Sequence, residues 1–269
     1  MRHDARFQLA GLAAISLIAA AAGGPGALAR SPQVQVGIPG CGDDGPVRAS
    51  REAITFASRG RPIRAYLYTP QGQANGAAVV MLHGGTGFEM NSILFDAHAI
   101  QLASRGYWVI LPAYFDAARP DPSRSTVTAR AWRQAAMDAA GQLALKPGVS
   151  AGQVALWGYS RGAGVAVDAA TDPASTTRSV ILAAGGGSVD GSVEGRDLSV
   201  LLLHARRDEA VPVRATLQLA EDLKGAGAAV EVQGLDFDGH QYDLPTWCAV
   251  MDRTRAFLEG RREPQSGPA

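Results

Sequence analysis

The sequence has no excess of charge of either sign. Its 25 Lys and Arg residues balance its 25 Asp and Glu residues, so the formal net charge is zero. A protein without a global field has no long-range attraction for nucleic acid, an anionic membrane or an acidic partner. We therefore expect no nucleic-acid partner, and the charge gives no information about the ligand.

The chain also lacks an apolar run long enough to cross a bilayer comfortably. A spanning helix needs about 20 apolar residues, and the N-terminal apolar stretch covers only residues 9–22. Arg2 and Arg6 precede this stretch, and the small-x-small pattern Ala27-Leu28-Ala29 follows it, as in a signal peptide. We predict a signal peptide over residues 1–29, a periplasmic or secreted protein, and no stable membrane insertion after cleavage. The alternative is a retained anchor.

Cysteine is scarce, with Cys41 and Cys248 as the only two. In an oxidising compartment, this pair could form a disulfide between the N-terminal segment and the last predicted helix. A disulfide requires closely spaced Cα atoms, which a sequence does not specify. Two free thiols remain an equal alternative at this point.

No internal repeat is present, and a chain of 269 residues can form one α/β domain. The hydrophobic share of 46% and the charged share of 19% are typical of globular proteins. We expect a Gly/Pro-rich leader over residues 30–50, a single catalytic domain over 51–260, and a disordered tail over 261–269.

Apolar runs typical of strands alternate with longer stretches of helical periodicity. A hairpin around Arg59-Gly60 is predicted first. Strands are expected at 53–57, 63–68, 77–82, 108–112, 154–157, 179–183 and 200–203, with a weaker one at 230–233. Helices are expected at 93–104, 125–145, 163–170, 213–225 and 245–258. This alternation predicts an α/β fold, with a doubly wound, mostly parallel sheet of about eight strands and helices on both faces.

The sequence Gly158-Tyr159-Ser160-Arg161-Gly162 follows a predicted strand and begins a predicted helix. A serine at such a tight turn lies in strained backbone, so small residues must flank it. The turn places the hydroxyl above the carboxyl edge of the sheet, where open α/β folds bind ligands. Ser160 is therefore the candidate nucleophile, and a purely structural turn is the alternative.

A serine nucleophile needs a base, and His240 is the best candidate among five histidines. His3 leaves with the signal peptide, and His98 lies inside a predicted helix. His83 and His204 end predicted strands, where we expect each to satisfy backbone groups. His240 lies in a predicted loop over residues 236–243, and it comes last in the chain order Ser, acid, His.

The acid that orients this base should lie between Ser160 and His240 in sequence. Asp208 follows the predicted strand at 200–203 and can reach a neighbouring loop from the carboxyl edge. Its alternative role is a helix cap or an ion-pair partner of Arg206 or Arg207. Asp236 and Asp238 are rival candidates for the acid.

Two backbone amides should stabilise the oxyanion of an acyl-transfer reaction. The amide of Arg161 follows the nucleophile, and the turn at 83–87 (HGGTG) supplies the second donor, from Gly85 first and Thr86 second. A phosphate-binding turn is the alternative, but no Gly-Lys-Ser/Thr follows. We expect no metal and no cofactor.

Four motifs together resemble the α/β-hydrolase superfamily in its dienelactone hydrolase-like branch: HGG at 83–85, GYSRG at 158–162, HARRDEAVP at 204–212 and DGH at 238–240. The resemblance covers about residues 53–258. It implies an α/β-hydrolase fold and an acyl-enzyme mechanism acting on small esters or lactones. Dienelactone hydrolases proper have a Cys nucleophile and a Glu after the third strand. Ser160 and the HGG sequence differ from both, which favours a general carboxylesterase.

The short segment at 185–197 predicts that no cap domain covers the site. Tyr114, Phe115, Trp157 and Tyr159 are then the expected substrate-binding walls. Two other functions fit the same motifs. One is a serine peptidase similar to the prolyl oligopeptidase group, although no N-terminal propeller is present. The other is a non-catalytic binding protein on a hydrolase fold.

Overall fold

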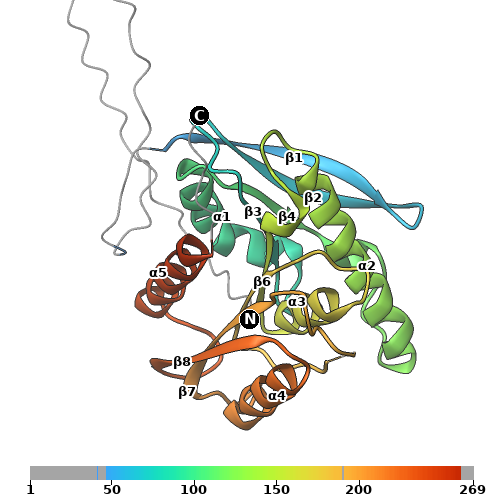
Figure 1. Cartoon of the computed structure of the whole chain (residues 1–269), viewed down its shortest axis with the longest axis vertical. Helices are drawn as coiled ribbons and strands as arrows, with labels where there is room; N and C mark the ends of the chain where they lie inside the picture. The colour runs from blue at the N-terminus through green and yellow to red at the C-terminus, as the bar shows by residue number, and fades with distance from the viewer. Residues whose placement is uncertain (1–40, 42–46, 190, 262–269) are drawn as a thin grey trace, which may run out of the picture. The chain divides into compact units, whose positions relative to one another are not determined.

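Eight strands form one sheet in the order β1-β2-β4-β3-β5-β6-β7-β8 (Figure 1). The computed structural model describes residues 41, 47–189 and 191–261. The predicted signal peptide, most of the leader and residues 262–269 lie outside this part of the chain. All described residues belong to the unit Val34–Ala269.

The strands are β1 (Ala49–Ser58), β2 (Arg61–Pro70), β3 (Ala78–Leu82), β4 (Trp108–Pro112), β5 (Val154–Tyr159), β6 (Ser179–Ala183), β7 (Ser199–Arg207) and β8 (Ala229–Asp238). The helices are α1 (Phe88–Ser104), α2 (Ser125–Ala144), α3 (Arg161–Thr171), α4 (Val213–Gly225) and α5 (Leu244–Gly260). Three short 3-10 turns are η1 (Tyr114–Asp116), η2 (Pro122–Arg124) and η3 (Ala151–Gln153).

The predicted mostly parallel, doubly wound sheet is confirmed. Only β1–β2 and β2–β4 pair antiparallel, and the pairs from β4 through β8 are parallel. The hairpin between β1 and β2 turns at Arg59 and Gly60, which both have positive φ. This geometry matches the right-handed twist of the two strands, so the turn fixes their register.

Side chains that alternate along the central strands form two separate cores. Val80 and Leu82 of β3 pack with residues of α2, α3 and α4, whereas Val79 and Met81 pack with α1 and α5. Figure 1 shows these helices on the two sides of the sheet. Strands buried on both faces explain the continuous apolar runs in the sequence.

Several predicted boundaries were wrong because polar residues continue the elements. β7 extends beyond residue 203 to Arg207, and β8 extends beyond residue 233 to Asp238. Their outer ends pair around a bulge, and the exposed Arg206 side chain contacts Asp236 and Asp238 across the pair. A strand end that is paired through charged side chains has no apolar run in the sequence that would predict it. Similarly, α1 begins at Phe88 rather than at residue 93.

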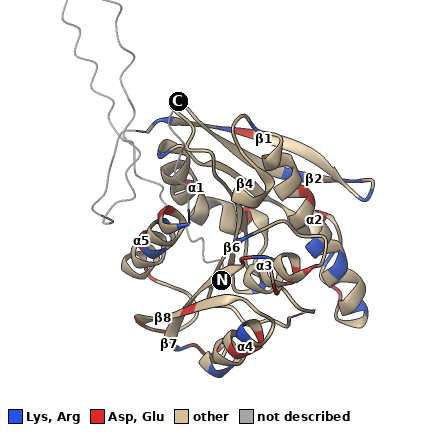
Figure 2. Ribbon diagram, viewed as in Figure 1, with Lys and Arg blue, Asp and Glu red and all other residues tan. Residues whose placement is uncertain are grey.

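The described part of the connection between β6 and β7 forms no cap domain: residues 184–189 and 191–198 contain no helix or strand. None of the described helices is both long and apolar enough to span a membrane. Figure 2 shows acidic and basic residues side by side on β1, α2, α4 and α5. This mixture agrees with the net charge of zero.

The structure joins Cys41 to Cys248 in a disulfide, with 5.2 Å between their Cα atoms. Of the two alternatives left open by the sequence, the disulfide is the one that the fold allows. The bond closes a loop with a sequence separation of 207 residues and ties the N-terminal segment to α5. A loop of this length restricts the unfolded chain strongly.

Replacing both cysteines by serine is expected to lower the free energy of unfolding by about 2–5 kcal/mol, because the unfolded chain regains the loop entropy. Urea unfolding with and without a reductant measures the effect. The reductant should destabilise the wild type and leave the Cys41→Ser/Cys248→Ser variant unchanged. Equal unfolding midpoints for wild type and variant without reductant would contradict this role.

Candidate active site

The turn from β5 into α3 places Ser160 at the carboxyl edge of the sheet. Ser160 has φ 54° and ψ −118°, a left-handed conformation that is uncommon for a residue with a side chain. Its amide donates to the Ala183 carbonyl at 2.9 Å, which ties the turn to the end of β6. The predicted strained turn is therefore present.

The two flanking glycines are required by close backbone contacts. A Cβ at Gly158 would overlap the carbonyl oxygen of Gly162, and a Cβ at Gly162 would overlap the carbonyl oxygen of Leu82. Backbone atoms cannot rotate away as a side chain can. The Gly-x-Ser-x-Gly pattern thus follows from the packing of α3 against β3 and β5.

Gly158→Ala is expected to lower the free energy of unfolding by about 3 kcal/mol or more, because the added methyl forces the turn apart. Gly141→Ala on α2 is the matched control, since a Cβ there meets no atom within 4 Å. That change should stabilise the protein by up to about 1 kcal/mol through helix propensity. Chemical denaturation of both variants checks the pair, and equal stabilities would refute the explanation.

Three side chains from separate segments meet at this edge. Ser160 Oγ lies 2.8 Å from His240 Nε2. His240 Nδ1 lies 2.8 Å from Asp208 Oδ2. The Asp208 side chain is fully buried, whereas that of His240 is 14% exposed. The arrangement gives a hydroxyl, an imidazole and a carboxylate in line, with the imidazole open to a ligand.

Backbone donors hold the carboxylate in place. Asp208 Oδ1 accepts from the amides of Ala210 at 2.9 Å and Val211 at 2.8 Å. These bonds leave Oδ2 to face His240. Two filled acceptor positions on Oδ1 orient the carboxylate before any substrate binds.

The rival acids have other partners. Arg206 lies 2.9 Å from Asp236 and 3.4 Å from Asp238, and Arg207 lies 3.6 Å from Asp238. Asp236 belongs to β8 rather than to a loop, and its side chain is 90% exposed. These arginines therefore pair with β8, and the alternative ion-pair role considered for Asp208 belongs to Asp236 and Asp238.

The turn after β3 lies next to this site and contains two amides without an acceptor in the described part of the chain. A hydrogen bond from the Gly87 amide to the Gly84 carbonyl, at 3.2 Å, closes this turn. The Gly84 amide donates to Asn91 Oδ1 at 2.6 Å. Gly85 and Thr86 occupy its two central positions. No residue in the described part of the chain accepts from their amides. A Cβ on Gly85 would lie 3.4 Å from Arg161 Nε, so the Arg161 side chain reaches the turn. A Cβ on Gly162 would lie 2.5 Å from the His83 carbonyl oxygen, so the start of α3 packs against the residue that precedes the turn.

Arg161 combines two features at this position. It is the first residue of α3, where helix amides have no partner within the helix. Its exposed guanidinium lies over the Trp132 ring at 5.7 Å. The structure therefore brings together the start of α3, where the Arg161 amide lies, and the turn that contains Gly85 and Thr86.

Of the four aromatic residues predicted to bind substrate, Trp157 was assigned wrongly. Its side chain is fully buried and packs against Phe95 and Trp247 beneath α1 and α5, with Nε1 donating to Thr254 at 3.2 Å. Neighbouring strand residues point to opposite faces, so Trp157 faces a helix layer rather than the carboxyl edge.

Tyr159 and Tyr114 are also buried, and both support the site rather than line it. The Tyr159 hydroxyl donates to the His240 carbonyl at 2.6 Å, and its ring stacks on the imidazole. The Tyr114 hydroxyl donates to the His83 carbonyl at 2.8 Å. Phe115 is half-buried and meets the His83 ring edge-on. Phe115 alone of the four keeps appreciable exposed surface.

The remaining described histidines are buried. Desolvation lowers the pKa of His83 and of His98 to about 4, so both are neutral at physiological pH. His83 Nδ1 contacts the Gly84 carbonyl, and His204 Nε2 contacts the Val211 carbonyl, as expected for histidines that satisfy backbone groups. Neither touches Ser160.

Sequence reasoning missed several supporting residues. Asn91 anchors the turn after β3, and Thr216 of α4 contacts His204 at 2.7 Å. Tyr159 was noted only as a possible wall. Asn91 and Thr216 lie in no motif whose spacing signals a role, and Tyr159 occupies a variable position of the Gly-x-Ser-x-Gly pattern. Their contacts join segments that are distant in sequence.

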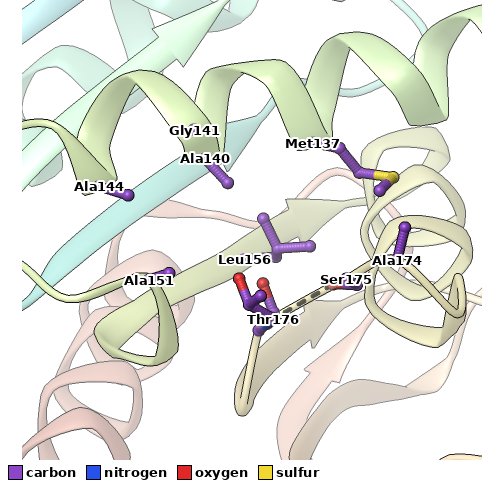
Figure 3. A pocket seen from close by; sticks show the side chains of 10 residues that line it. Met137, Ala140, Gly141, Ala144, Ala151, Leu156, Ala174, Ser175 and Thr176 are labelled. Carbon is purple, nitrogen blue, oxygen red and sulfur yellow. Dashed lines mark hydrogen bonds between the residues drawn. The ribbon is translucent and has the colours of Figure 1, made fainter.

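A separate pocket of about 110 Å³ lies at the opposite, amino edge of the sheet (Figure 3). Met137, Ala140 and Ala144 of α2 form one wall, and the segment from Ala174 to Thr177 forms another. This segment precedes β6, whereas Ser160 follows β5. The pocket therefore does not belong to the site at the carboxyl edge.

Comparison with known proteins gives a family and several similar structures. The model of the dienelactone hydrolase family matches residues 63–242. No curated protein matches the chain. A hyperthermophilic esterase from Pyrobaculum calidifontis is 21% identical, with 78% of this chain and 86% of that chain covered and a TM-score of 0.62.

Two further structures have the same fold. An acetyl xylan esterase from Paenibacillus sp. R4 is 16% identical, covering 79% of this chain and 84% of that one at a TM-score of 0.60. A dienelactone hydrolase-like promiscuous phosphotriesterase from metagenomic libraries is 17% identical, covering 79% and 98% at a TM-score of 0.64. At these identities the likeness establishes the fold.

Proposed function

We propose that this chain, which belongs to the dienelactone hydrolase family, cleaves carboxylic esters or lactones through an acyl-enzyme formed on Ser160. The family resemblance inferred from the four sequence motifs is confirmed, and membership makes the chain a carboxylesterase-like hydrolase. The observation that carries the finer proposal is the unbroken contact from Ser160 through His240 to Asp208.

The first half of the proposed reaction forms the acyl-enzyme. His240 Nε2 removes the proton of Ser160 Oγ as that oxygen attacks the ester carbonyl carbon. Asp208 holds the Nδ1–H tautomer and stabilises the imidazolium that forms. Nε2–H then gives the proton to the leaving alkoxide as the carbon–oxygen bond breaks. The alcohol departs and the acyl group stays on Ser160.

The second half repeats these steps with water. His240 removes a proton from a water molecule, the hydroxide attacks the acyl carbon, and the proton returns to Ser160 as the acid leaves. In both halves the carbonyl oxygen becomes negative. We assign its stabilisation to the amide of Arg161 and to an amide of the turn at Gly85 or Thr86, each worth about 3 kcal/mol.

The substrate class follows from the nucleophile and the open site. A serine at an edge where the described β6–β7 connection forms no cap suits small-molecule esters of varied shape. Phe115 is the proposed contact for the substrate among the predicted aromatic residues, since Tyr114, Trp157 and Tyr159 are buried.

A panel of p-nitrophenyl esters of increasing acyl length, simple lactones and a peptide p-nitroanilide tests the function. We expect turnover of esters, with rates for the amide lower by orders of magnitude. Labelling by a fluorophosphonate probe, followed by intact mass measurement, checks for an activated serine. Preferred cleavage of the amide would support the peptidase alternative, and absence of both labelling and turnover would support the binding-protein alternative.

We also propose that the protein is exported and that residues 1–29 are removed. The Cys41–Cys248 disulfide supports this proposal, because such bonds persist in oxidising compartments. N-terminal sequencing of the protein from a periplasmic extract or the medium should begin at Arg30. A mature chain that still begins at Met1 would contradict the proposal.

A further inference from the structure

A second buried histidine lies against the carboxylate of the proposed triad. His204 is in β7, and its side chain is 2% exposed. Its Nε2 lies 3.7 Å from Asp208 Oδ2, the same oxygen that faces His240. Asp208 is therefore shared between two imidazoles, one of which has no contact with Ser160.

His204 is also part of a chain of three short polar contacts. Its Nε2 lies 2.9 Å from the Val211 carbonyl oxygen, and its Nδ1 lies 2.7 Å from Thr216 Oγ1. Thr216 Oγ1 in turn lies 2.5 Å from the Gly185 carbonyl oxygen. His204 and Thr216 are both buried, so these contacts lie away from bulk solvent.

The number of hydrogens that these contacts need favours a charged ring. Three contacts need three hydrogens, and both ends of the chain are carbonyl oxygens, which only accept. Thr216 supplies one hydrogen, which it donates to Gly185. A neutral imidazole supplies one more hydrogen. One of the three contacts then has no hydrogen, and two lone pairs face each other there. An imidazolium supplies two, and every contact becomes a hydrogen bond.

The surroundings both oppose and favour that charge. Desolvation is the largest influence and holds the pKa of His204 below its ordinary value. A charged His240 acts in the same direction, whereas the Val211 carbonyl and the Asp208 carboxylate act against it and the hydrogen count favours the charged ring. The Thr216 oxygen adds another acceptor, since its own hydrogen is committed to Gly185. Asp208 and His240 are the titratable groups that act on the ring, and Asp208 also contributes to the raised pKa of buried Tyr242. An unpaired carbonyl facing a ring lone pair would carry the full cost of an unsatisfied buried group.

We propose that His204 is held as an imidazolium and acts as a positioning residue, whose charge beside Asp208 weakens the hold of His240 on a proton. The charge state itself stands on the geometry alone. Its effect on catalysis rests on the proposed function. A positive charge on His204 opposes a second positive charge on the neighbouring His240, so the acid limb of the activity profile is the readout of the proposal.

The kinetic test uses Thr216→Val, which nearly preserves side-chain volume and removes the hydroxyl that accepts from Nδ1. The ring should then become neutral, and the acid limb of the kcat/KM profile should move to higher pH by about one unit. Thr216→Ser keeps the hydroxyl and should restore the wild-type profile. His204→Gln, which cannot carry the charge, should shift the limb in the same direction.

The charge is read directly by long-range proton–nitrogen NMR of ¹⁵N-labelled protein near neutral pH. We expect both ring nitrogens of His204 to be protonated in the wild type and in Thr216→Ser, and only one in Thr216→Val. The His204→Gln spectrum assigns the signals. A single protonated nitrogen in the wild type overturns the proposal, as does an acid limb that is unchanged in Thr216→Val and His204→Gln.

These readouts separate the two proposals. If esterase activity survives Ser160→Ala, the proposed function fails, yet the NMR spectrum still tests the imidazolium. If the triad reading holds and His204 is neutral, only the further inference fails. A thermal unfolding curve for each variant verifies that a shifted profile comes from a folded enzyme.

Discussion

Replacing Ser160 by alanine is expected to lower kcat for a p-nitrophenyl ester by about 10⁶-fold, with KM little changed. The alanine removes the only oxygen within hydrogen-bond distance of His240 Nε2 in the described structure, so no covalent acyl-enzyme can form. The amides at the turn and at the start of α3 remain. They should leave a small residual rate above that of water.

Initial-rate kinetics and fluorophosphonate labelling measure this loss. Ser175→Ala is the matched control, because Ser175 lines the pocket at the amino edge, remote from the carboxyl edge. It should keep wild-type kcat and one equivalent of label. A Ser160→Ala variant that retains even a hundredth of the wild-type kcat, with no contaminating esterase, would remove Ser160 from the mechanism.

The parts of the site that sequence reasoning located are those imposed by backbone geometry. Gly158 and Gly162 are fixed by contacts with Gly162 and Leu82 backbone atoms, which leave no space for a Cβ. A constraint of this kind appears in the sequence as a pattern of residue types at fixed spacing. Ser160, Asp208 and His240 follow β5, β7 and β8. These strands have the same order along the chain and across this part of the sheet, so the three residues come to one edge.

The parts that sequence reasoning missed depend on side chains that meet only in the folded sheet. Trp157 precedes Ser160 by three residues, and the direction of its side chain depends on which helix layer packs on that face of β5. Thr216 reaches His204 because α4 packs beside β7. Neither fact follows from local propensity, since the same residue types occur in many unrelated helices and strands.

The ends of β7 and β8 illustrate the same limit for the fold. An apolar run predicted the buried part of each strand, but the outer parts contain Arg206, Arg207 and Asp236. These residues stabilise the pairing through charge across the two strands. The extension matters for function, because it carries the chain to Asp208 and to the segment that holds His240.

Asp208→Asn is expected to lower kcat by about 10⁴-fold through a change of imidazole tautomer. The amides of Ala210 and Val211 donate to Oδ1, so the asparagine oxygen must take that position. Its NH₂ group then replaces Oδ2 and donates to His240 Nδ1. The ring hydrogen moves to Nε2, which can no longer accept the proton of Ser160.

The same substitution at the rival acids provides the control. Asp236→Asn and Asp238→Asn remove ion pairs of exposed Arg206 and Arg207, and such pairs contribute about 0–1 kcal/mol to stability. Both should keep kcat within about threefold, since neither carboxylate contacts His240. Steady-state kinetics on the three variants therefore identifies the acid: a large loss at 236 or 238 with a small loss at 208 would transfer the role.

The Asp208→Asn substitution also turns an NH₂ group toward His204 Nε2, because Oδ2 faces both imidazoles. Among these three variants, only Asp208→Asn should therefore change the NMR signal of the His204 ring, which would link both histidines to one oxygen.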